Sequence, residues 1–291
     1  MDPLLKLALL VAFCPAPSAM VFYLVSRSRH TTRHAGSSTA GQARRRPAGE
    51  SIRARLEELD QQIYAWLTYL AMCPAILALV AVLTRVPGVA LAIGLFSGSI
   101  LWTGLCAIKL HQLHQQRAEA ELGFDGCRRV AEELNRLPAE GFEVYHDVPF
   151  DAFHIDHVLV GPPGVFAIET KTRLDRQRRA THPEVQFDGF RVNWPSESYG
   201  LEQTVSRARF LAQWLLEVLG QEIEVTPILT LPGWTVACVA PNPSALVLNP
   251  KEIGKLSELK LVHLNEELIR RVCHHLTQRC AVGWPMPARD P

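Results

Sequence analysis

Two acidic residues and a lysine stand at the ends of two short apolar runs near the middle of the chain, HIDHVLV and VFAIETK. The GPPG sequence between the runs favours a tight turn and predicts a β-hairpin in which Val160 pairs with Val165. That register sets Asp156 opposite Glu169, and strand alternation puts Lys171 on the same face as Glu169. Opposed carboxylates favour a divalent cation between them, and a lysine beside that cation favours an anionic substrate. Together these residues predict phosphodiester hydrolysis.

The spacing of these residues is a loose pattern that also fits a surface hairpin with an incidental Glu-Lys pair. The two runs that carry them are apolar throughout, which is typical of central strands covered on both faces. Charged residues that follow such strands lie at the rim of a core, where the functional groups of α/β proteins gather. The context therefore favours a site.

The residues around this hairpin resemble the NERD (nuclease-related) domain, a branch of the PD-(D/E)XK restriction-endonuclease-like superfamily. The resemblance covers about residues 118–232. It joins, in order, a helix that begins GFDGCRRVAEEL, a strand in FEVYHDVPF, the Asp strand, the turn and the Glu-x-Lys strand. It implies an α/β fold with a restriction-endonuclease-like mixed sheet flanked by helices. It also implies a nuclease that cleaves DNA with Mg2+ or Mn2+.

The resemblance assigns roles to single residues. Asp156 and Glu169 fall on the metal ligands of the family, and Lys171 falls on the lysine near the scissile phosphate. A helical glutamine of the family corresponds to Gln203. The chemistry of hard cations adds the carbonyl of Thr170 as a further oxygen ligand.

Three more side chains are candidates for substrate binding. The hairpin register places His154 across from Lys171. Arg173 and Arg176 follow the Glu-x-Lys strand and predict a local basic groove, with a solvated loop as the alternative. The formal net charge of the whole chain, +1, adds no support for a duplex binder.

One position departs from the family's pattern. The upstream helix of the family usually reads G-x-x-G-E, but here Cys127 follows Gly126. That glutamate commonly completes the acidic cluster, so its loss leaves two acidic ligands and lowers the expected affinity for a metal. An alternative function is therefore a catalytically weakened domain that binds DNA or a protein partner at the membrane. A third possibility is a membrane protein whose domain serves only for assembly.

The N-terminal part of the chain has an apolar surplus that predicts membrane helices. Three stretches without a charged residue, each near the length of a helical span, are 7–25, 64–84 and 86–108. We therefore predict a transmembrane helix in residues 1–25, with a signal peptide as the alternative. A transmembrane helical hairpin with a tight turn at residues 85–88 is predicted over residues 63–108, with the lipid bilayer as its partner.

Residues 26–62 predict a basic, flexible loop. Between residues 26 and 55, eight arginines stand against one acid, Glu50. The positive-inside rule keeps such a loop in the cytoplasm, and two later crossings return the chain to the same side. The sequence therefore predicts a multi-pass protein of a bacterial-type inner (plasma) membrane with a cytoplasmic C-terminal domain. Contact of the 26–55 stretch with anionic lipid is favoured over a DNA-binding arm.

Residues 109–282 predict the NERD-like nuclease domain, and residues 283–291 a loose, Pro-rich tail. Helices are expected at 112–137, 201–219 and 264–280. Strands are expected at 142–148, 224–231, 235–240 and 245–248, and those at 224–231 and 235–240 are expected to be buried. A second hairpin is expected at 185–194, with its turn at Asp188-Gly189. Seven scattered cysteines without a C-x-x-C pair fit a reducing compartment rather than a disulfide framework. No Gly-rich phosphate-binding motif suggests a nucleotide site.

Overall fold

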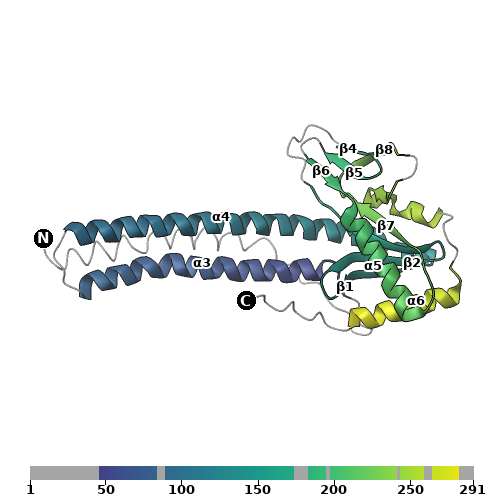
Figure 1. The fold of residues 1–291 in the computed structure, drawn as a ribbon, viewed down its shortest axis with the longest axis horizontal. Helices are drawn as coiled ribbons and strands as arrows, with labels where there is room; N and C mark the ends of the chain where they lie inside the picture. The colour runs from purple at the N-terminus through teal and green to yellow at the C-terminus, as the bar shows by residue number, and fades with distance from the viewer. Residues whose placement is uncertain are drawn as a thin grey trace. The chain divides into compact units, whose positions relative to one another are not determined.

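The computed structural model describes residues 46–83, 89–173, 183–194, 197–240, 243–258 and 264–281 of the 291-residue chain. These residues divide into two compact units (Figure 1). One unit consists of the described residues within 55–119, and the other of 46–54 together with the described residues within 120–281. The predicted helix in 1–25, the loop up to residue 45, Arg176 and the tail at 283–291 lie outside the described residues.

The first unit contains most of two long helices, α3 (Glu50–Leu83) and α4 (Val89–Leu134). Two contacts show that these helices lie side by side. The indole N–H of Trp102 donates to the carbonyl of Tyr69 at 3.3 Å, and Arg117 binds Asp60 at 2.8 Å. Since α3 begins at Glu50, the predicted loop is helical over residues 50–62.

The predicted membrane helices are not supported. In the ranges that the structure describes, no helix combines the length and the apolar character needed to cross a membrane. The residues of the predicted turn between the two spans, 85–88, lie outside those ranges.

The second unit is built on a mixed five-stranded sheet, which confirms the predicted α/β class. Its strands, in spatial order, are β1 (Glu143–Pro149), β2 (His154–Gly161), β3 (Gly164–Thr170), β7 (Val225–Thr230) and β9 (Leu246–Leu248). The first three strands pair antiparallel, whereas β3, β7 and β9 pair parallel. A short 3-10 helix, Leu137–Glu140, precedes β1.

The central hairpin has the register that the sequence predicts. Val160 pairs with Val165, and Gly161 pairs with Gly164. Gly164 has a φ of +143°, a backbone conformation that glycine adopts far more readily than other residues. Residues 155–161 of β2 and 164–169 of β3 are buried, as expected for strands covered on both faces.

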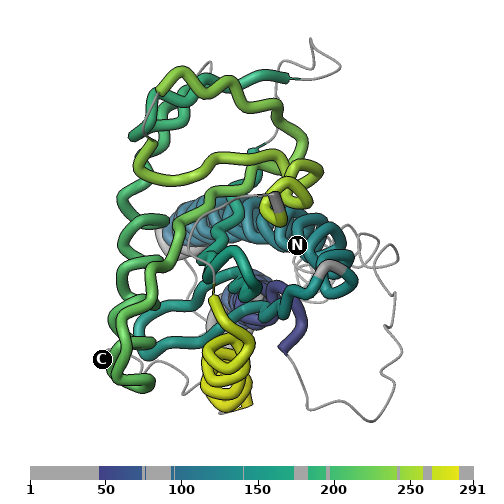
Figure 2. Tube along the Cα trace, turned by 90° about the vertical axis from the view of Figure 1, so that its right-hand side faces the viewer, coloured from purple at the N-terminus to yellow at the C-terminus, as the bar shows by residue number. Residues whose placement is uncertain are grey.

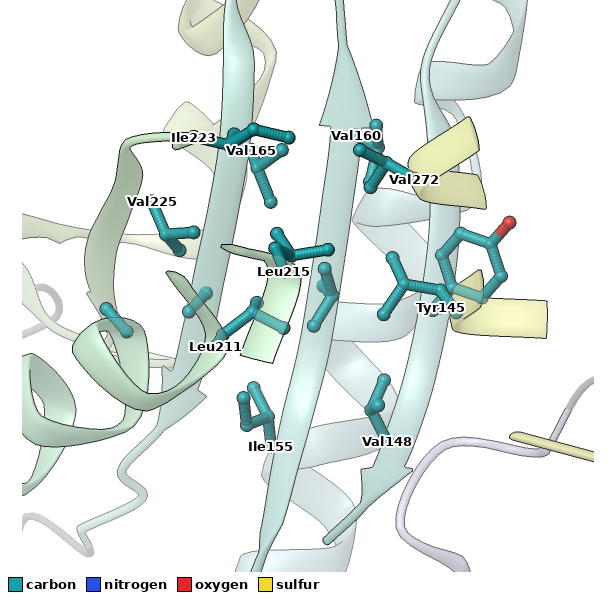
Figure 3. Packing of buried hydrophobic residues seen from close by; sticks show 14 of the residues in the cluster. Tyr145, Val148, Ile155, Val160, Val165, Leu211, Leu215, Ile223, Val225 and Val272 are labelled. Atoms are coloured by element: carbon teal, nitrogen blue, oxygen red, sulfur yellow. The ribbon is translucent and has the colours of Figure 1, made fainter. Parts of the chain in front are cut away.

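Two helices cover one face of this sheet. They are α5 (Glu202–Leu219) and α6 (Glu266–Ala281). Leu211 and Leu215 of α5 pack with Val160 and Val165 of the hairpin in a cluster that also includes Val272 of α6 (Figure 3). Removing such apolar area from water contributes roughly 25 cal/mol per Å2. Leu211 and Leu215, which lie one helical turn apart, therefore hold α5 on the strands that carry the acidic residues.

The other face of the sheet packs against the last turns of α4 and a 3-10 helix, Pro250–Glu258. Val130 and Leu134 of α4 join Phe166 and Ile168 of β3 in this second cluster. No sequence pattern predicted this 3-10 helix, whose Ile253 is buried in the cluster. The hairpin strands are thus enclosed by helical segments on both sides.

A smaller four-stranded sheet follows the hairpin along the chain. Its strands, in spatial order, are β6 (Glu197–Gly200), β5 (Arg191–Trp194), β4 (Glu184–Phe187) and β8 (Thr235–Cys238). These strands form a group separate from the larger sheet (Figure 2). The predicted turn at Asp188 is confirmed, since its carboxylate accepts the N–H of Arg191 at 2.7 Å. A strand does form within the predicted range 235–240, but the prediction that it is buried is wrong. Strand β8 is partly exposed because it lies at the edge of this sheet.

Candidate active site

The β2–β3 hairpin brings the two predicted acidic ligands together. Its ladder runs as far as His157 and Ile168, and one further step along each strand reaches Asp156 and Glu169. The N–H of Thr170 donates to Asp156 Oδ2 at 2.8 Å, so the Asp156 carboxylate lies against the backbone that directly follows Glu169. Both acidic residues are only 8% exposed. The site is therefore a buried pair of carboxylates at the end of the hairpin.

His154 orients the first of these acids. Its Nε2 lies 3.3 Å from Asp156 Oδ1. Burial by itself would raise the pKa of Asp156, but the hydrogen bond from His154 and the Thr170 N–H bring that pKa below its ordinary value. Burial also acts to lower the pKa of His154, and Asp156 outweighs it, so the pKa of His154 is raised. The two groups thus stabilise each other in the charged form.

Helix α5 supplies the partners of the second acid. Thr204 Oγ1 donates to Glu169 Oε2 at 3.1 Å, and Arg207 Nη1 donates to Oε1 at 2.9 Å. Burial raises the pKa of Glu169, while the positive charge of Arg207 opposes that rise. Because the net shift is upward, one guanidinium does not fully compensate the buried carboxylate.

Lys171 lies beside an aromatic ring from the smaller sheet. Its Nζ is 4.6 Å from the centroid of the Tyr199 ring, close enough for a cation–π contact. The Tyr199 hydroxyl in turn donates to Gln203 Oε1 at 3.4 Å. Burial and the negative charge of Glu169 raise the pKa of Tyr199 to about 12, so its hydroxyl stays protonated. Tyr199 therefore links the two predicted residues, Lys171 and Gln203.

Arg173 pairs with an acidic residue of the smaller sheet. Its Nη2 binds Glu197 Oε1 at 2.5 Å, and its carbonyl accepts the indole N–H of Trp234 at 3.1 Å. Since the pair with Glu197 is partly exposed, it contributes little to stability. Arg173 joins the end of β3 to the smaller sheet, and its role in substrate binding stays a prediction.

A family comparison identifies the part of the chain that holds this geometry. Residues 122–232 match the family model described as NERD, nuclease-related domain. The chain contains a NERD domain. The match includes the hairpin, α5 and the strands β4 to β6, and it is consistent with the PD-(D/E)XK-like superfamily. Neither a curated protein nor a solved structure matches the chain.

In this NERD domain, the position of the family's helix glutamate is electrically neutral. Cys127 Sγ lies 3.5 Å from His157 Nε2, and His157 Nδ1 contacts His146 Nδ1 at 2.8 Å. Burial and the nearby charge of Asp156 raise the pKa of Cys127, so the thiol stays protonated. Burial likewise lowers the pKa of His157 to about 3. Cys127 therefore adds no negative charge to the acidic pair.

The end of α4 approaches the site closely because residue 126 is glycine. A Cβ atom at Gly126 would lie 1.8 Å from Thr172 Oγ1, the residue directly after Lys171. Any side chain at position 126 would therefore force Thr172 or the helix to shift. Gly126, the second glycine of the G-x-x-G motif, thus allows this close approach, although the glutamate that usually follows it is absent.

The acidic pair fits a magnesium ion in the type and number of its donors. No group of three His, Cys, Asp or Glu side chains in the described part of the chain is arranged to hold a metal. Mg2+ is usually bound through one or two carboxylates together with waters and substrate phosphates. Asp156 and Glu169 supply two such carboxylates, and Arg207 only partly offsets the charge of Glu169. The Thr170 carbonyl as a third ligand stays a prediction.

Two partners of Glu169 carried little signal in the sequence. Arg207 follows Gln203 by one helical turn, and from the sequence a solvated helix face was favoured for both residues over an approach to the active site. Thr204 is a small polar residue whose burial, at 1% exposure, depends on how α5 is rotated against the sheet. Only the packing of that helix shows that both side chains reach the acid.

Arg207 occupies one oxygen of Glu169 that a metal would use, so replacing it is expected to strengthen metal binding. In Arg207→Gln, we expect the affinity for Mn2+ to rise by about tenfold, the scale of one hydrogen bond to a charged group. Titration calorimetry of the full-length protein would measure this change. The matched control is Arg209→Gln, an exposed arginine on the same helix, which should leave Mn2+ affinity unchanged. Weaker binding in Arg207→Gln would mean instead that the arginine holds Glu169 in the shape a metal needs.

Proposed function

We propose that the protein is a metal-dependent nuclease that hydrolyses phosphodiester bonds in DNA. The observation that carries this proposal is the pairing of Asp156 with Glu169 at the end of the hairpin of a NERD domain, with Lys171 directly after it. A buried acidic pair is costly unless cations compensate it. A divalent ion and a lysine provide that compensation and also bind a phosphate.

The residues of the site would divide the work of hydrolysis. Asp156 and Glu169 would hold Mg2+ or Mn2+, which when bound supplies Lewis acidity toward the phosphate and lowers the pKa of a water. The water oxygen forms a bond to phosphorus, the bond to the leaving sugar oxygen breaks, and a proton ends on that oxygen. Lys171 would stabilise the negative charge that builds up on the phosphoryl oxygens. His154 would keep Asp156 ionised and oriented, as the 3.3 Å contact indicates.

Cleavage assays on the full-length protein test this proposal. We expect supercoiled or single-stranded DNA to be cut in Mg2+ or Mn2+ and to stay intact in EDTA. Asp156→Asn keeps the size of the side chain and removes its charge, so it should abolish cutting while DNA binding in EDTA is retained. Metal-independent cutting, or full activity of Asp156→Asn, would contradict the proposal.

The neutral thiol of Cys127 favours a second candidate function. The domain would then be a weakened nuclease that binds DNA or a protein partner without cleaving it. Under this alternative, the wild-type protein binds DNA but does not cut it in either metal, and Cys127→Glu restores cutting. Cys127→Gln, which matches the size of glutamate without its charge, should restore nothing.

We also propose that the chain is attached to a bacterial-type plasma membrane, with the NERD domain in the cytoplasm. Large apolar side chains are exposed on α3 and α4: Tyr64, Tyr69, Met72, Ile76, Ile93, Phe96, Ile100, Leu101, Leu105 and Ile108. A lipid bilayer would cover them. The basic stretch 26–55 supports the cytoplasmic side and contact with anionic lipid. Recovery in a membrane fraction that resists alkaline washing is expected, and a freely soluble full-length protein would contradict this proposal.

A further inference from the structure

We infer that Phe153 and Phe210 form a base-stacking surface beside the acidic pair, and that this surface selects single-stranded nucleic acid as the substrate. The inference rests on the proposed nuclease function and adds a class of substrate to it. Its evidence is a cluster of aromatic rings that continues directly from the site.

Four aromatic side chains make up this surface, which we call the aromatic platform: Phe150, Phe153, Phe210 and Trp214. Phe150 and Phe153 come from the segment between β1 and β2, whereas Phe210 and Trp214 lie one turn apart on α5. The Phe150 ring is stacked on Phe153 at 5.5 Å between centroids and meets Phe210 edge-on at 5.0 Å. Phe153 and Phe210 meet at 4.9 Å.

The platform has a buried base and an open side. Phe150 is 2% exposed, whereas Phe210 is 44% exposed and Phe153 and Trp214 are partly exposed. The buried Phe150 ring contacts all three of the other rings and holds them in a defined position. Rings held in this way can accept another planar group without losing much side-chain freedom.

The chain connects the platform to the acidic pair at two points. Phe153 directly precedes His154, which contacts Asp156. Arg207 binds Glu169 at 2.9 Å, and its guanidinium carbon lies 5.7 Å from the centroid of the Phe153 ring. A base stacked on Phe153 or Phe210 would therefore keep the backbone of its strand close to the carboxylates.

Positive charge accompanies the rings. The guanidinium carbon of Arg279 lies 5.1 Å from the centroid of the Phe150 ring. Arg279 also forms an ion pair with Asp151, whose side chain is almost fully exposed. Exposed pairs of this kind are weak, so a phosphate can compete for Arg279. Aromatic rings beside arginines are the combination that binds single strands, whose bases offer free faces for stacking. The bases of a duplex are already stacked on one another, so a duplex cannot use the platform without unpairing.

Oligonucleotide binding to the full-length protein in EDTA tests the inference without cleavage. Three labelled probes of about 15 nucleotides are compared by fluorescence anisotropy: a single strand, the same sequence as a duplex, and a strand of abasic sites with the same phosphates. The wild-type protein should bind the normal single strand at least tenfold more tightly than the abasic strand. Phe210→Ala should weaken binding of the normal strand by about tenfold and leave the other two probes unchanged.

Three further variants separate stacking from simple loss of packing. Phe210→Leu keeps an apolar side chain but removes the ring, so it should bind as weakly as Phe210→Ala, whereas Phe210→Trp should bind like the wild type. Leu216→Ala, which changes another exposed apolar residue on α5, should have no effect on any probe. Equal affinity for the normal and abasic strands, or wild-type binding by Phe210→Leu, would overturn the inference.

The nuclease proposal and the platform fail in different assays. If the protein cuts DNA in Mg2+ but does not distinguish normal from abasic strands, the nuclease stands and the platform is wrong. If binding depends on the Phe210 ring but no metal supports cutting, the platform stands as a binding surface and the nuclease proposal is wrong.

Discussion

Replacing Lys171 with alanine is expected to lower the rate of DNA cleavage by about 10²- to 10³-fold, the usual effect of removing one group that stabilises charge in a transition state. The lysine directly follows the carboxylate pair in the chain, and its ammonium is held over Tyr199 at 4.6 Å from the ring centroid. Its backbone N–H donates to the carbonyl of Thr230 at 3.0 Å, and alanine keeps that bond. The fold should therefore survive while the charge is lost.

The measurement is the single-turnover rate of full-length Lys171→Ala in Mn2+, with DNA affinity in EDTA as a second readout. We expect a large loss of rate and a change in affinity of only a few-fold. Lys171→Arg should recover part of the rate, because its planar, forked donors keep the charge but not the geometry of an ammonium. Tyr199→Phe is the matched control, since it keeps the ring under the ammonium and loses only the bond to Gln203. Wild-type cleavage by Lys171→Ala would remove the lysine from the mechanism.

The largest effect on stability is expected at a buried carboxylate, Asp147 of β1, which is 1% exposed. Arg46 binds it through Nε at 3.1 Å and Nη2 at 2.7 Å, and Ser51 adds its hydroxyl and its backbone N–H. These two residues belong to the stretch before and at the start of α3, so a segment 101 residues away in sequence is tied to β1. Arg46→Ala would leave a buried charge without its counter-ion, a change that costs about 3–5 kcal/mol.

Chemical denaturation of the full-length protein measures this cost. Arg136→Ala, which breaks an exposed pair with Glu133, is the matched control and should cost at most about 1 kcal/mol. Arg46→Ala combined with Asp147→Asn should be less destabilising than Arg46→Ala alone, because the buried charge is then gone. Equal stability of Arg46→Ala and Arg136→Ala would refute the role of this pair. A fragment that starts at Lys109 lacks both Arg46 and Ser51, and it should be less stable than the full chain for the same reason.

The central hairpin shows how far local interactions can be followed from sequence. A Gly-Pro-Pro-Gly turn and two apolar runs were sufficient to predict that Val160 pairs with Val165, and the structure has this pair. A shift of one residue would turn every side chain of a strand to the opposite face, so a buried hairpin allows a single register. The same local logic predicted a helix over 201–219, and α5 ends at Leu219 with Gly220, whose φ is +67°, as its C-cap.

The edges of the fold were harder to predict. Strand β6 and the 3-10 helix at Pro250–Glu258 were missed, because short elements have little periodicity of their own and depend on neighbours for their partners. Strand β8 was predicted to be buried, but its place at the edge of the smaller sheet exposes it. Apolar character alone predicted membrane spans in residues that form two long helices, and these spans are not supported in the described part of the chain.

The sequence by itself determined the mixed α/β class, the register of the central hairpin and the proximity of Asp156 to Glu169, because turns and strand alternation act between near neighbours. Only the tertiary structure decided that Arg207 and Thr204 bind Glu169, that Tyr199 lies beside Lys171, and that Arg46 neutralises Asp147. These contacts join residues from 28 to 101 positions apart. They depend on how a helix is rotated against a sheet and on where a distant segment docks, and no periodic pattern in a single sequence specifies either.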